Sequence, residues 1–486
     1  MDSVRTPPGQ RKLRQKTSRK ISVGKKERAN LKFFANLREK SGKWFDDLAR
    51  RAPARLTLAV FLSIIAIHTA ILCLPISTRD PSHARFVDAL FTSTSAVCVT
   101  GLTVVPSDTY WSPFGLVVIM LGVEIGGLGV MTLASMLSLA VSRHIGLTAR
   151  ILAAGEKKSS LGEVGSLGKM ALLVSVSVES VIALMLFPEF IRQDYGVGMS
   201  AWYAVFMAVS VFNNAGFVIV PGGVEQFVSD VGIIGPMCLG VFIGAIGFPV
   251  SLDLARNWRR PKHLSLHSKL TITTYLALSV VGGGITATIE WNNPRTMGAL
   301  DLPGKFLAAL LGAFNARSLG ISTVDVGSMH EATWFVSSVM MFIGGGSAST
   351  AGGIKVTTFA VMVLAILAEV RGNRDIEAFG RRIGPSTARL AVAVVAMSSL
   401  VIGLSTAILM LLTDLPLSKA LFEVNSAFGT VGLSTGITGS LPDSGKILLS
   451  LLMFTGRVGS MTFGAALAMR NRRRVIRFPE EAPSIG

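Results

Sequence analysis

The chain has 486 residues, of which 50% are hydrophobic and 16% are charged, against about 25% charged in an average soluble domain. A soluble protein of this length would divide into domains joined by polar linkers, and no such linker occurs between residues 56 and 469, which excludes that class. The formal net charge of +18 lies largely at both ends and in a few loops. Because no nucleic-acid motif accompanies this charge, it favours flanks that face anionic membrane lipid over a nucleic-acid partner.

The chain begins with a basic segment, residues 1–55, that lacks the apolar core of a signal peptide. We therefore expect this segment to remain in the cytoplasm. The three cysteines, Cys73, Cys98 and Cys238, lie in apolar stretches without paired spacing. Neither a disulfide framework nor a zinc site is expected from them.

Eight apolar stretches are long enough to cross about 30 Å of hydrocarbon, near residues 56–75, 113–142, 170–190, 231–256, 269–289, 333–369, 388–412 and 445–469. The loops 143–169, 256–269 and 370–389 are rich in Lys and Arg, and they alternate with connections that are poorer in both. The positive-inside rule therefore predicts that both termini and these three loops face the cytoplasm.

The four outward connections each contain a second, shorter apolar stretch, near residues 84–97, 200–213, 303–316 and 417–428. These stretches are too short to span a bilayer, so we predict re-entrant helices. Backbone leaves helical form at membrane depth only where protein or water covers it. Four re-entrant helices on one side therefore predict a central lined pathway.

A repeated string follows each of these short helices and can be aligned on Gly101, Gly216, Gly320 and Gly432. A large apolar residue lies ten positions before each glycine, and a serine lies six positions before three of them, at Ser95, Ser210 and Ser426. Glycine tolerates a positive φ and leaves an axis open. It thereby allows a ring of carbonyl oxygens to replace the hydration shell of an ion.

A helix that enters from outside also points its partly negative C-terminus at the membrane centre, which favours a cation there. The alternative is that the four glycines only permit close helix packing, but their common register after four re-entrant helices favours a pore. The predicted fold is an all-α polytopic membrane protein. Its four span–pore helix–span repeats are arranged pseudo-fourfold around one ion pore.

With these motifs the chain resembles the Trk/Ktr/HKT superfamily of potassium transporters, most closely its Ktr-type membrane subunits. The resemblance covers residues 56–470 and rests on the segments 99–102, 212–217, 316–325 and 426–435. Within this family, a glycine in all four filters accompanies potassium preference, and a serine in the first filter is associated with sodium in some plant relatives. Position 101 is a glycine here.

The resemblance implies four selectivity-filter segments that bind potassium through backbone carbonyls. The candidate ion-binding residues are Cys98, Val99, Thr100, Gly101, Asn213, Asn214, Ala215, Gly216, Arg317, Ser318, Leu319, Gly320, Gly429, Thr430, Val431 and Gly432. For the Arg317 side chain we favour a bracing role behind the pore helix. If the first segment lines the pore, small thiol reagents applied from outside should reach Cys98. The role of Glu124, where the family often has glutamine, stays open between attracting cations and pairing with a base.

The sixth span is interrupted by glycines and hydroxyl residues, which unwind a helix. The resemblance implies an intramembrane gate loop beneath the filter, although Ser347 and Ala348 replace the usual Pro-Gly pair. Arg457 lies deep in the last span, where an arginine must face protein or a cavity, and it is expected beside this loop. The candidate gate residues are Gly344, Gly345, Gly346, Ser347, Ala348, Ser349, Thr350, Ala351, Gly352, Gly353, Lys355 and Arg457.

The sequence thus predicts electrochemically driven potassium uptake across a bacterial plasma membrane by a multi-pass, non-enzymatic subunit with no organic cofactor. The resemblance implies a homodimer on a cytosolic, nucleotide-binding regulator-of-conductance ring of the KtrA type. A sodium-permeable or sodium-coupled member of the same fold and a secondary transporter for an organic substrate are the alternatives. The predicted segments are 1–55 (basic N-terminal segment), 56–142, 170–256, 269–369 and 388–469 (repeats 1 to 4) and 470–486 (basic tail).

Overall fold

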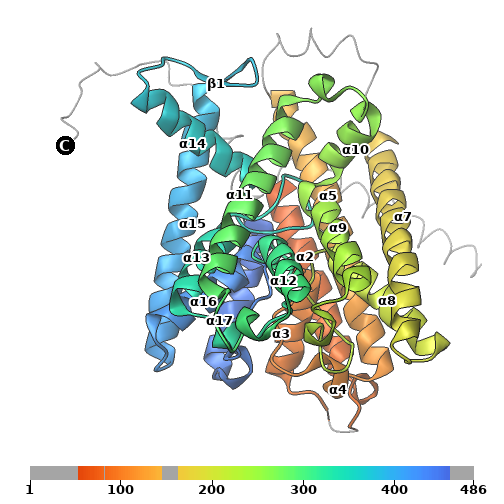
Figure 1. Cartoon of the computed structure of the whole chain (residues 1–486). Helices are drawn as coiled ribbons and strands as arrows, with labels where there is room; N and C mark the ends of the chain where they lie inside the picture. The colour runs from red at the N-terminus through yellow and green to blue at the C-terminus, as the bar shows by residue number, and fades with distance from the viewer. Residues whose placement is uncertain (1–52, 81–82, 145–161, 460–486) are drawn as a thin grey trace, which may run out of the picture. The chain divides into compact units, whose positions relative to one another are not determined.

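The computed structural model describes residues 53–80, 83–144 and 162–459 (Figure 1). Contacts divide the chain into residues 1–56 and residues 57–486, and the second unit is described below. The predictions for residues 1–52 and 460–486, including the basic tail and the end of the eighth span, lie outside the described residues.

The helices follow the order span, short helix, span in four successive groups. The first group is α2 (Pro53–Leu72), α3 (Phe86–Val97) and α5 (Pro113–His144), with η1 (Pro75–Ser77) and α4 (Ser107–Tyr110) in its connections. The second is α7 (Gly162–Arg192), α8 (Val197–Phe212), η2 (Glu225–Phe227), α9 (Val231–Ile246) and α10 (Phe248–Asn257). Two further groups complete the described chain.

The third group starts after η3 (Pro261–His263) and comprises α11 (Leu266–Glu290), η4 (Met297–Ala299), α12 (Leu302–Asn315), η5 (Val326–Ser328), α13 (Glu331–Phe342) and α14 (Val356–Val370). The fourth comprises α15 (Pro385–Leu412), α16 (Leu417–Gly429), η6 (Thr438–Ser440), α17 (Asp443–Phe454) and a π-helical turn (Thr455–Gly459). A short antiparallel hairpin, β1 (Ile376–Ala378) and β2 (Arg381–Ile383), joins α14 to α15. The sequence did not predict this hairpin.

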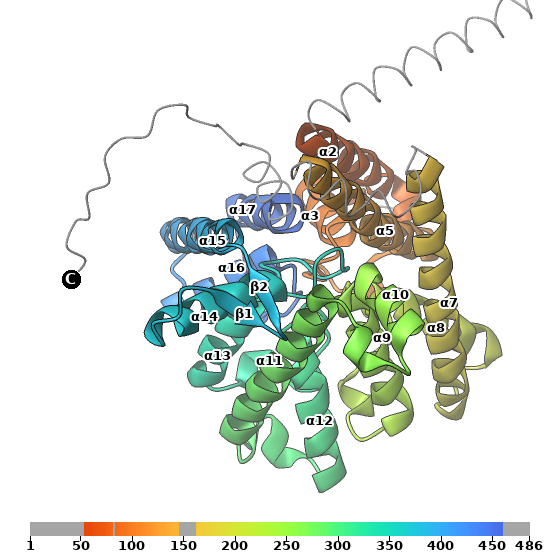
Figure 2. The same ribbon diagram turned by 90° about the horizontal axis from the view of Figure 1, so that it is seen from above.

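The four groups are arranged in a ring when viewed from above (Figure 2). Each group touches the next through a defined helix pair: α5 with α7, α9 with α12 and α13 with α16. The ring is closed by α17, which packs against α3 of the first group. The short helices α3, α8, α12 and α16 lie in the lower half of Figure 1, whereas α10 and the hairpin lie at its upper end.

Capping residues fix where several helices begin. The Asp301 carboxylate accepts a hydrogen bond from the Gly304 N–H (3.0 Å) at the start of α12, and the following Pro303 occupies the first turn. Ser265 accepts from the Ser268 N–H (3.2 Å) at the start of α11. These are the side chains and positions that satisfy the free N–H groups of a helix N-terminus.

By length and composition, three unbroken helices in the described part of the chain can cross a membrane: Gly168–Arg192, Leu266–Glu290 and Pro385–Leu412. The pair α9 and α10 provides a fourth if it is one span, but it bends by 103°. The apolar stretch predicted over 231–256 is thus two helices that meet at a bend. The bend lies at Gly247, whose φ of +89° few other residues adopt, and Pro249 starts the new helix.

Candidate ion pathway

The four aligned glycines meet at one place in the structure. A Cβ atom placed on Gly216 would lie 2.8 Å from the Leu319 carbonyl oxygen and 3.3 Å from Gly101 Cα. The equivalent Cβ on Gly320 would lie 2.5 Å from the Val431 carbonyl oxygen. A Cβ on Gly432 would collide with the Thr100 carbonyl, and one on Gly101 with the Ala215 carbonyl. Each segment thus abuts the next, and the fourth returns to the first, so the contacts close a ring.

The same main-chain conformation recurs in all four segments. The glycines have φ values of +90°, +72°, +72° and +95° in chain order. The residue two positions earlier also has a positive φ in every segment, at Val99, Asn214, Ser318 and Thr430. A positive φ at a non-glycine residue costs about 1–3 kcal/mol and persists only where the surroundings impose it. Its recurrence at equivalent positions indicates that the four segments serve one purpose.

A serine six positions before the glycine fastens three of the four segments to their short helices. Ser95 Oγ accepts a hydrogen bond from the Gly101 N–H (3.0 Å), and Ser426 Oγ accepts one from the Gly432 N–H (3.2 Å). Ser210 instead donates to the Phe217 carbonyl (2.8 Å). The third segment has no serine at this position, and the Leu319 N–H bonds the Asn315 carbonyl (3.3 Å).

The Arg317 side chain points away from the ring of glycines. It is 1% exposed, its Nη1 donates to the Ile343 carbonyl (3.3 Å), and its guanidinium lies 5.5 Å from the centre of the Tyr275 ring. This geometry is what a bracing role requires. Ser318 is the residue of this segment that reaches its neighbour, since its hydroxyl donates to the Thr430 carbonyl (2.8 Å).

The Cys98 side chain packs among apolar residues. It is fully buried in an apolar cluster with Val97, Leu102, Ala427 and Phe428. This burial argues against access of outside reagents to the thiol, which stays a prediction.

The broken sixth span was correctly predicted: α13 ends at Phe342 and α14 begins at Val356. The loop between them folds back on itself, because the Gly344 N–H bonds the Ile354 carbonyl (2.9 Å). It also pairs with the bend between α9 and α10, where the Gly346 N–H bonds the Ala245 carbonyl (2.8 Å). Residues 244–247 are thus a partner of the loop that sequence reasoning missed, although Gly247 and Pro249 signalled a break.

The loop lies directly against the segments of the second and fourth groups. Asn214 Nδ2 donates to Thr350 Oγ1 (2.6 Å), and Thr350 Oγ1 donates to the Phe212 carbonyl (3.3 Å). A Cβ on Gly352 would collide with the Thr430 side chain. The loop is therefore seated beside the four glycine segments.

Two cations, the buried Arg457 and the half-buried Lys355, hold consecutive carbonyls of this loop. Arg457, 1% exposed, donates through Nη1 to the Thr350 carbonyl and through Nη2 to the Gly126 carbonyl of α5 (3.4 Å). Lys355 Nζ donates to the Ala351 carbonyl (2.6 Å). Arg457 lies in the π-helical turn, and such turns often occur at functional sites. The structure thus places Arg457 beside the loop, as the resemblance implied.

The buried carboxylates of Glu423 and Glu179 were the main feature missed from the sequence, which had singled out Glu124 without assigning its role. Glu423 on α16 accepts hydrogen bonds from Ser434 (2.6 Å), from the Thr435 N–H (2.9 Å) and from Thr438 (2.8 Å), which fastens the chain that follows Gly432. Glu179 on α7 and Glu124 on α5 both reach Asn213 at the end of α8. An acidic residue inside an apolar span was the available signal.

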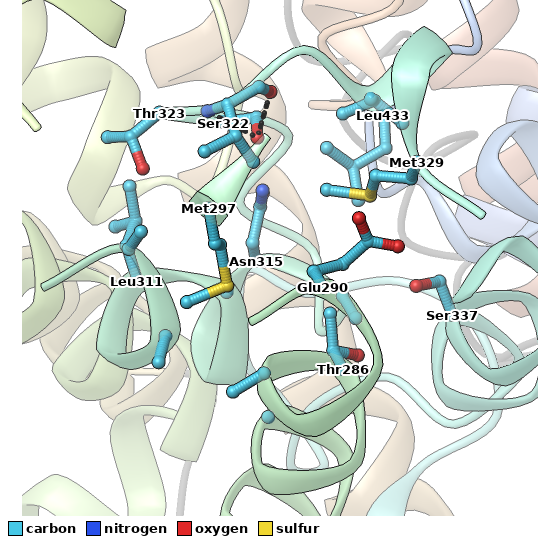
Figure 3. A pocket seen from close by; sticks show the side chains of 18 of the residues that line it. Thr286, Glu290, Met297, Leu311, Asn315, Ser322, Thr323, Met329, Ser337 and Leu433 are labelled. Atoms are coloured by element: carbon cyan, nitrogen blue, oxygen red, sulfur yellow. Dashed lines mark hydrogen bonds between the residues drawn. The ribbon is translucent and has the colours of Figure 1, made fainter. Parts of the chain in front are cut away.

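A cavity of about 40 Å³ lies beside α12, and Leu433, which follows Gly432, is among its lining residues (Figure 3). It is lined by residues of α11, α12 and α13, among them Asn315, Ser337 and Glu290. The Glu290 carboxylate is satisfied by Asn293 (2.7 Å) and Thr296 (2.7 Å) and by the His330 N–H (2.9 Å). This space has room for a water molecule or two and not for an organic solute.

A ring of four equivalent glycine segments within a helical membrane protein, with a loop seated beside it, defines the class of multi-pass cation-transport proteins. A family model described as "TrkH: Cation transport protein" matches residues 26–470. The chain belongs to this family.

Among its relatives, the Ktr system potassium uptake protein B of Bacillus subtilis is 38% identical over 429 residues, which is 88% of this chain and 95% of the relative. The protein of the same name from Vibrio alginolyticus is 33% identical, over 90% of this chain and 96% of the relative. The potassium/sodium uptake protein NtpJ of Enterococcus hirae is 32% identical, over 90% and 98%.

The crystal structure of the potassium transporter TrkH from Vibrio parahaemolyticus matches with a TM-score of 0.68 at 18% identity, over 85% of this chain and 84% of that chain. The family and the helical four-repeat fold predicted from the sequence are therefore confirmed.

Proposed function

We propose that this chain is the membrane subunit of a potassium-uptake system and that potassium passes through the ring of glycine segments. The closed ring of contacts among Gly101, Gly216, Gly320 and Gly432 carries this proposal. Carbonyl oxygens of the four segments would replace the hydration shell of the ion. The relatives named for potassium uptake support the choice of ion.

The energy for uptake comes from the membrane potential. Moving one charge through 100 mV is worth about 2.3 kcal/mol, so an inside-negative membrane accumulates potassium without a chemical step. The C-termini of α3, α8, α12 and α16, which precede the four glycines, add partial negative charge where the ion loses water. No organic cofactor is required of this chain.

The loop 343–355 acts as the gate in this proposal. Its contacts with Asn214 and Thr430 seat it against the filter segments, and Arg457 holds it through the Thr350 carbonyl. A buried positive charge near the axis also raises the electrostatic barrier to a permeating cation. Opening requires the loop to leave these partners.

The remaining assignments follow from the relatives and from the basic loops. α10, which leads into the basic loop 256–269, and the hairpin β1–β2 of the basic loop 370–389 lie at the same end (Figure 1). We assign this end and both termini to the cytoplasm of a bacterium, the protein being in the plasma membrane. Relatives are named as proteins of a "Ktr system", and this name supports the presence of a partner subunit. We assign the partner as a KtrA-type nucleotide-binding ring and this chain as a homodimer above it. The repeat boundaries predicted above are retained.

Complementation tests the proposal directly. A bacterium that lacks potassium uptake should grow at low potassium with the wild-type gene, and growth should fail with Gly101→Ser or Gly320→Ser. Gly403→Ser is the matched control, because Gly403 lies in α15 with open space around it. Growth of both filter variants at the wild-type rate would contradict the proposed pathway.

One observation keeps sodium as a second candidate ion, since NtpJ is named for both potassium and sodium. Reversal potentials in mixed potassium and sodium separate the two. A reversal potential that follows potassium alone supports the proposal, and one that follows sodium equally well replaces it with the sodium-permeable alternative.

A further inference from the structure

Two acidic side chains meet behind the second filter segment. Asn213 Nδ2 lies 2.9 Å from Glu124 Oε2 and 3.0 Å from Glu179 Oε1. Ser175 Oγ also reaches both groups, at 3.3 Å and 2.9 Å. Both carboxyl groups therefore share the Asn213 amide and the Ser175 hydroxyl as donors. Since a carboxylate is only an acceptor, a direct bond between the two carboxyl groups would require a proton on one of them.

No cation in the described part of the chain pairs with either carboxylate. The titratable residues on the elements packed around the pair are His68 (α2), Cys98 (after α3), Tyr203 (α8), Cys238 (α9) and Arg457. His68 bonds Ser93 and the Val118 carbonyl, and Arg457 bonds the Thr350 and Gly126 carbonyls. The remaining three are thiols or a phenol.

The charged residues farther along these elements have other places or partners. Glu189 pairs with Arg192 (2.7 Å) at one end of α7, and Lys169 lies toward the other end. Asp88 of α3 pairs with Lys446 (2.9 Å). Two ionised carboxylates sharing the same donors without a counter-charge repel each other strongly in a buried site.

We propose that Glu124 and Glu179 hold a single proton between them and that this pair, acting through Asn213, positions the second filter segment. Asn213 ends α8 and precedes Asn214, which donates to Thr350 of the gate loop. The position is tightly packed, because a Cβ on Gly127 would collide with Asn213 Oδ1. A change in the charge of the pair therefore reaches the filter and the gate loop within two residues. This inference rests on the proposed filter role of residues 213–216.

The shared proton gives transport a pH dependence with a defined sign. Removal of the proton at alkaline pH leaves two negative charges on the same donors, and their separation pulls Asn213 from its place. Transport should therefore fall as the pH rises through the upper titration of the pair, by about tenfold for each pH unit beyond it if the doubly ionised form is inactive.

Glutamine variants test the proton and the coupling separately. Infrared spectroscopy of the purified full-length protein should show a protonated carboxyl band that shifts in D2O in the wild type. Glu124→Gln and Glu179→Gln should each abolish it, because the amide donates to the remaining carboxylate. Glu189→Gln is the matched control on α7 and should retain the band. Persistence of the band in both variants of the pair, or its absence from the wild type, overturns the proposal, and absence would favour a bound metal cation instead.

The second measurement is potassium flux into proteoliposomes as a function of pH. The alkaline fall should be present in the wild type and in Glu189→Gln and absent from Glu124→Gln, while Glu124→Ala, which cannot donate, should transport poorly at every pH. An unchanged alkaline fall in Glu124→Gln overturns the coupling. The infrared band does not depend on the filter assignment. Failure of Gly320→Ser to impair transport would therefore refute the proposed ion pathway but would leave the shared proton to be judged by the infrared band.

Discussion

The four filter glycines are geometrically equivalent but not equally crowded, and this difference predicts a rank order for substitution by alanine. All four have a positive φ, and an L-residue with a side chain pays about 1–2 kcal/mol there. That shared cost corresponds to roughly a 5- to 30-fold loss of the correct conformation, since 1.4 kcal/mol is about tenfold. The contacts of the added Cβ then decide how much more transport each alanine variant loses.

At Gly216 the nearest atom would be 2.8 Å from that Cβ, whereas at Gly432 and Gly101 it would collide with a carbonyl oxygen of the neighbouring segment. Because these contacts are with backbone, neither partner can move cheaply. We expect Gly216→Ala to retain the most potassium transport, Gly320→Ala to retain less, and Gly101→Ala and Gly432→Ala to retain the least.

The assay is potassium flux and potassium-over-sodium preference in proteoliposomes, normalised to the amount of folded protein, with Gly403→Ala as the control. Gly403 has open space around it and no positive φ. On this reasoning, contact with the carbonyls of the neighbouring segment determines how much transport each variant loses. This explanation would be refuted if Gly216→Ala were as damaging as Gly432→Ala, or if all four variants matched the control.

Two further predictions concern the ring closure and the gate. Asp88 and Lys446 form a buried pair between α3 and α17, so Asp88→Asn should lower the free energy of unfolding by about 3–5 kcal/mol. Asp443→Asn breaks an exposed pair with Arg85 and should lower it by only about 0–1 kcal/mol. Thermal unfolding in detergent compares the two variants, and equal losses of stability would contradict the role of the buried pair in closing the ring. Arg457→Gln removes a charged hydrogen bond to the Thr350 carbonyl, worth about 1.5–3 kcal/mol, and should raise flux through the subunit measured alone by about tenfold or more; unchanged flux would argue against a gate.

The fold could be read from the sequence because its main signals are local. Runs of apolar residues, clusters of Lys and Arg in loops, and a glycine after each short helix follow from the chemistry of single segments in a bilayer. The serine register before Gly101 and Gly432 was visible as well, and its hydrogen bonds to the glycine N–H groups explain it. The aligned glycines then required only that four similar units share an axis.

The features that the sequence did not yield depend on contacts between distant segments. The bend at Gly247 exists because the loop from α13 to α14 lies against it, where a Cβ would meet the Ser347 carbonyl. The sequence over 231–256 marks a break at Gly247 and Pro249 but does not reveal this partner. In the same way, Glu124 could not be assigned, because Glu179 and Asn213 lie 55 and 89 residues away in the chain. Only the packing of α5, α7 and α8 brings the three groups together.

The gate loop comes from the third group of helices, yet its contacts reach all the others. Thr350 receives a hydrogen bond from Asn214 in the second group, Gly352 packs on Thr430 in the fourth, and Arg457 ties the Thr350 carbonyl to Gly126 in the first. A movement that frees the pathway must therefore break bonds to the filter segments themselves. If the loop is the gate, as proposed, substitutions which loosen it should also alter ion preference, because Thr350 belongs to the loop and contacts the second glycine segment.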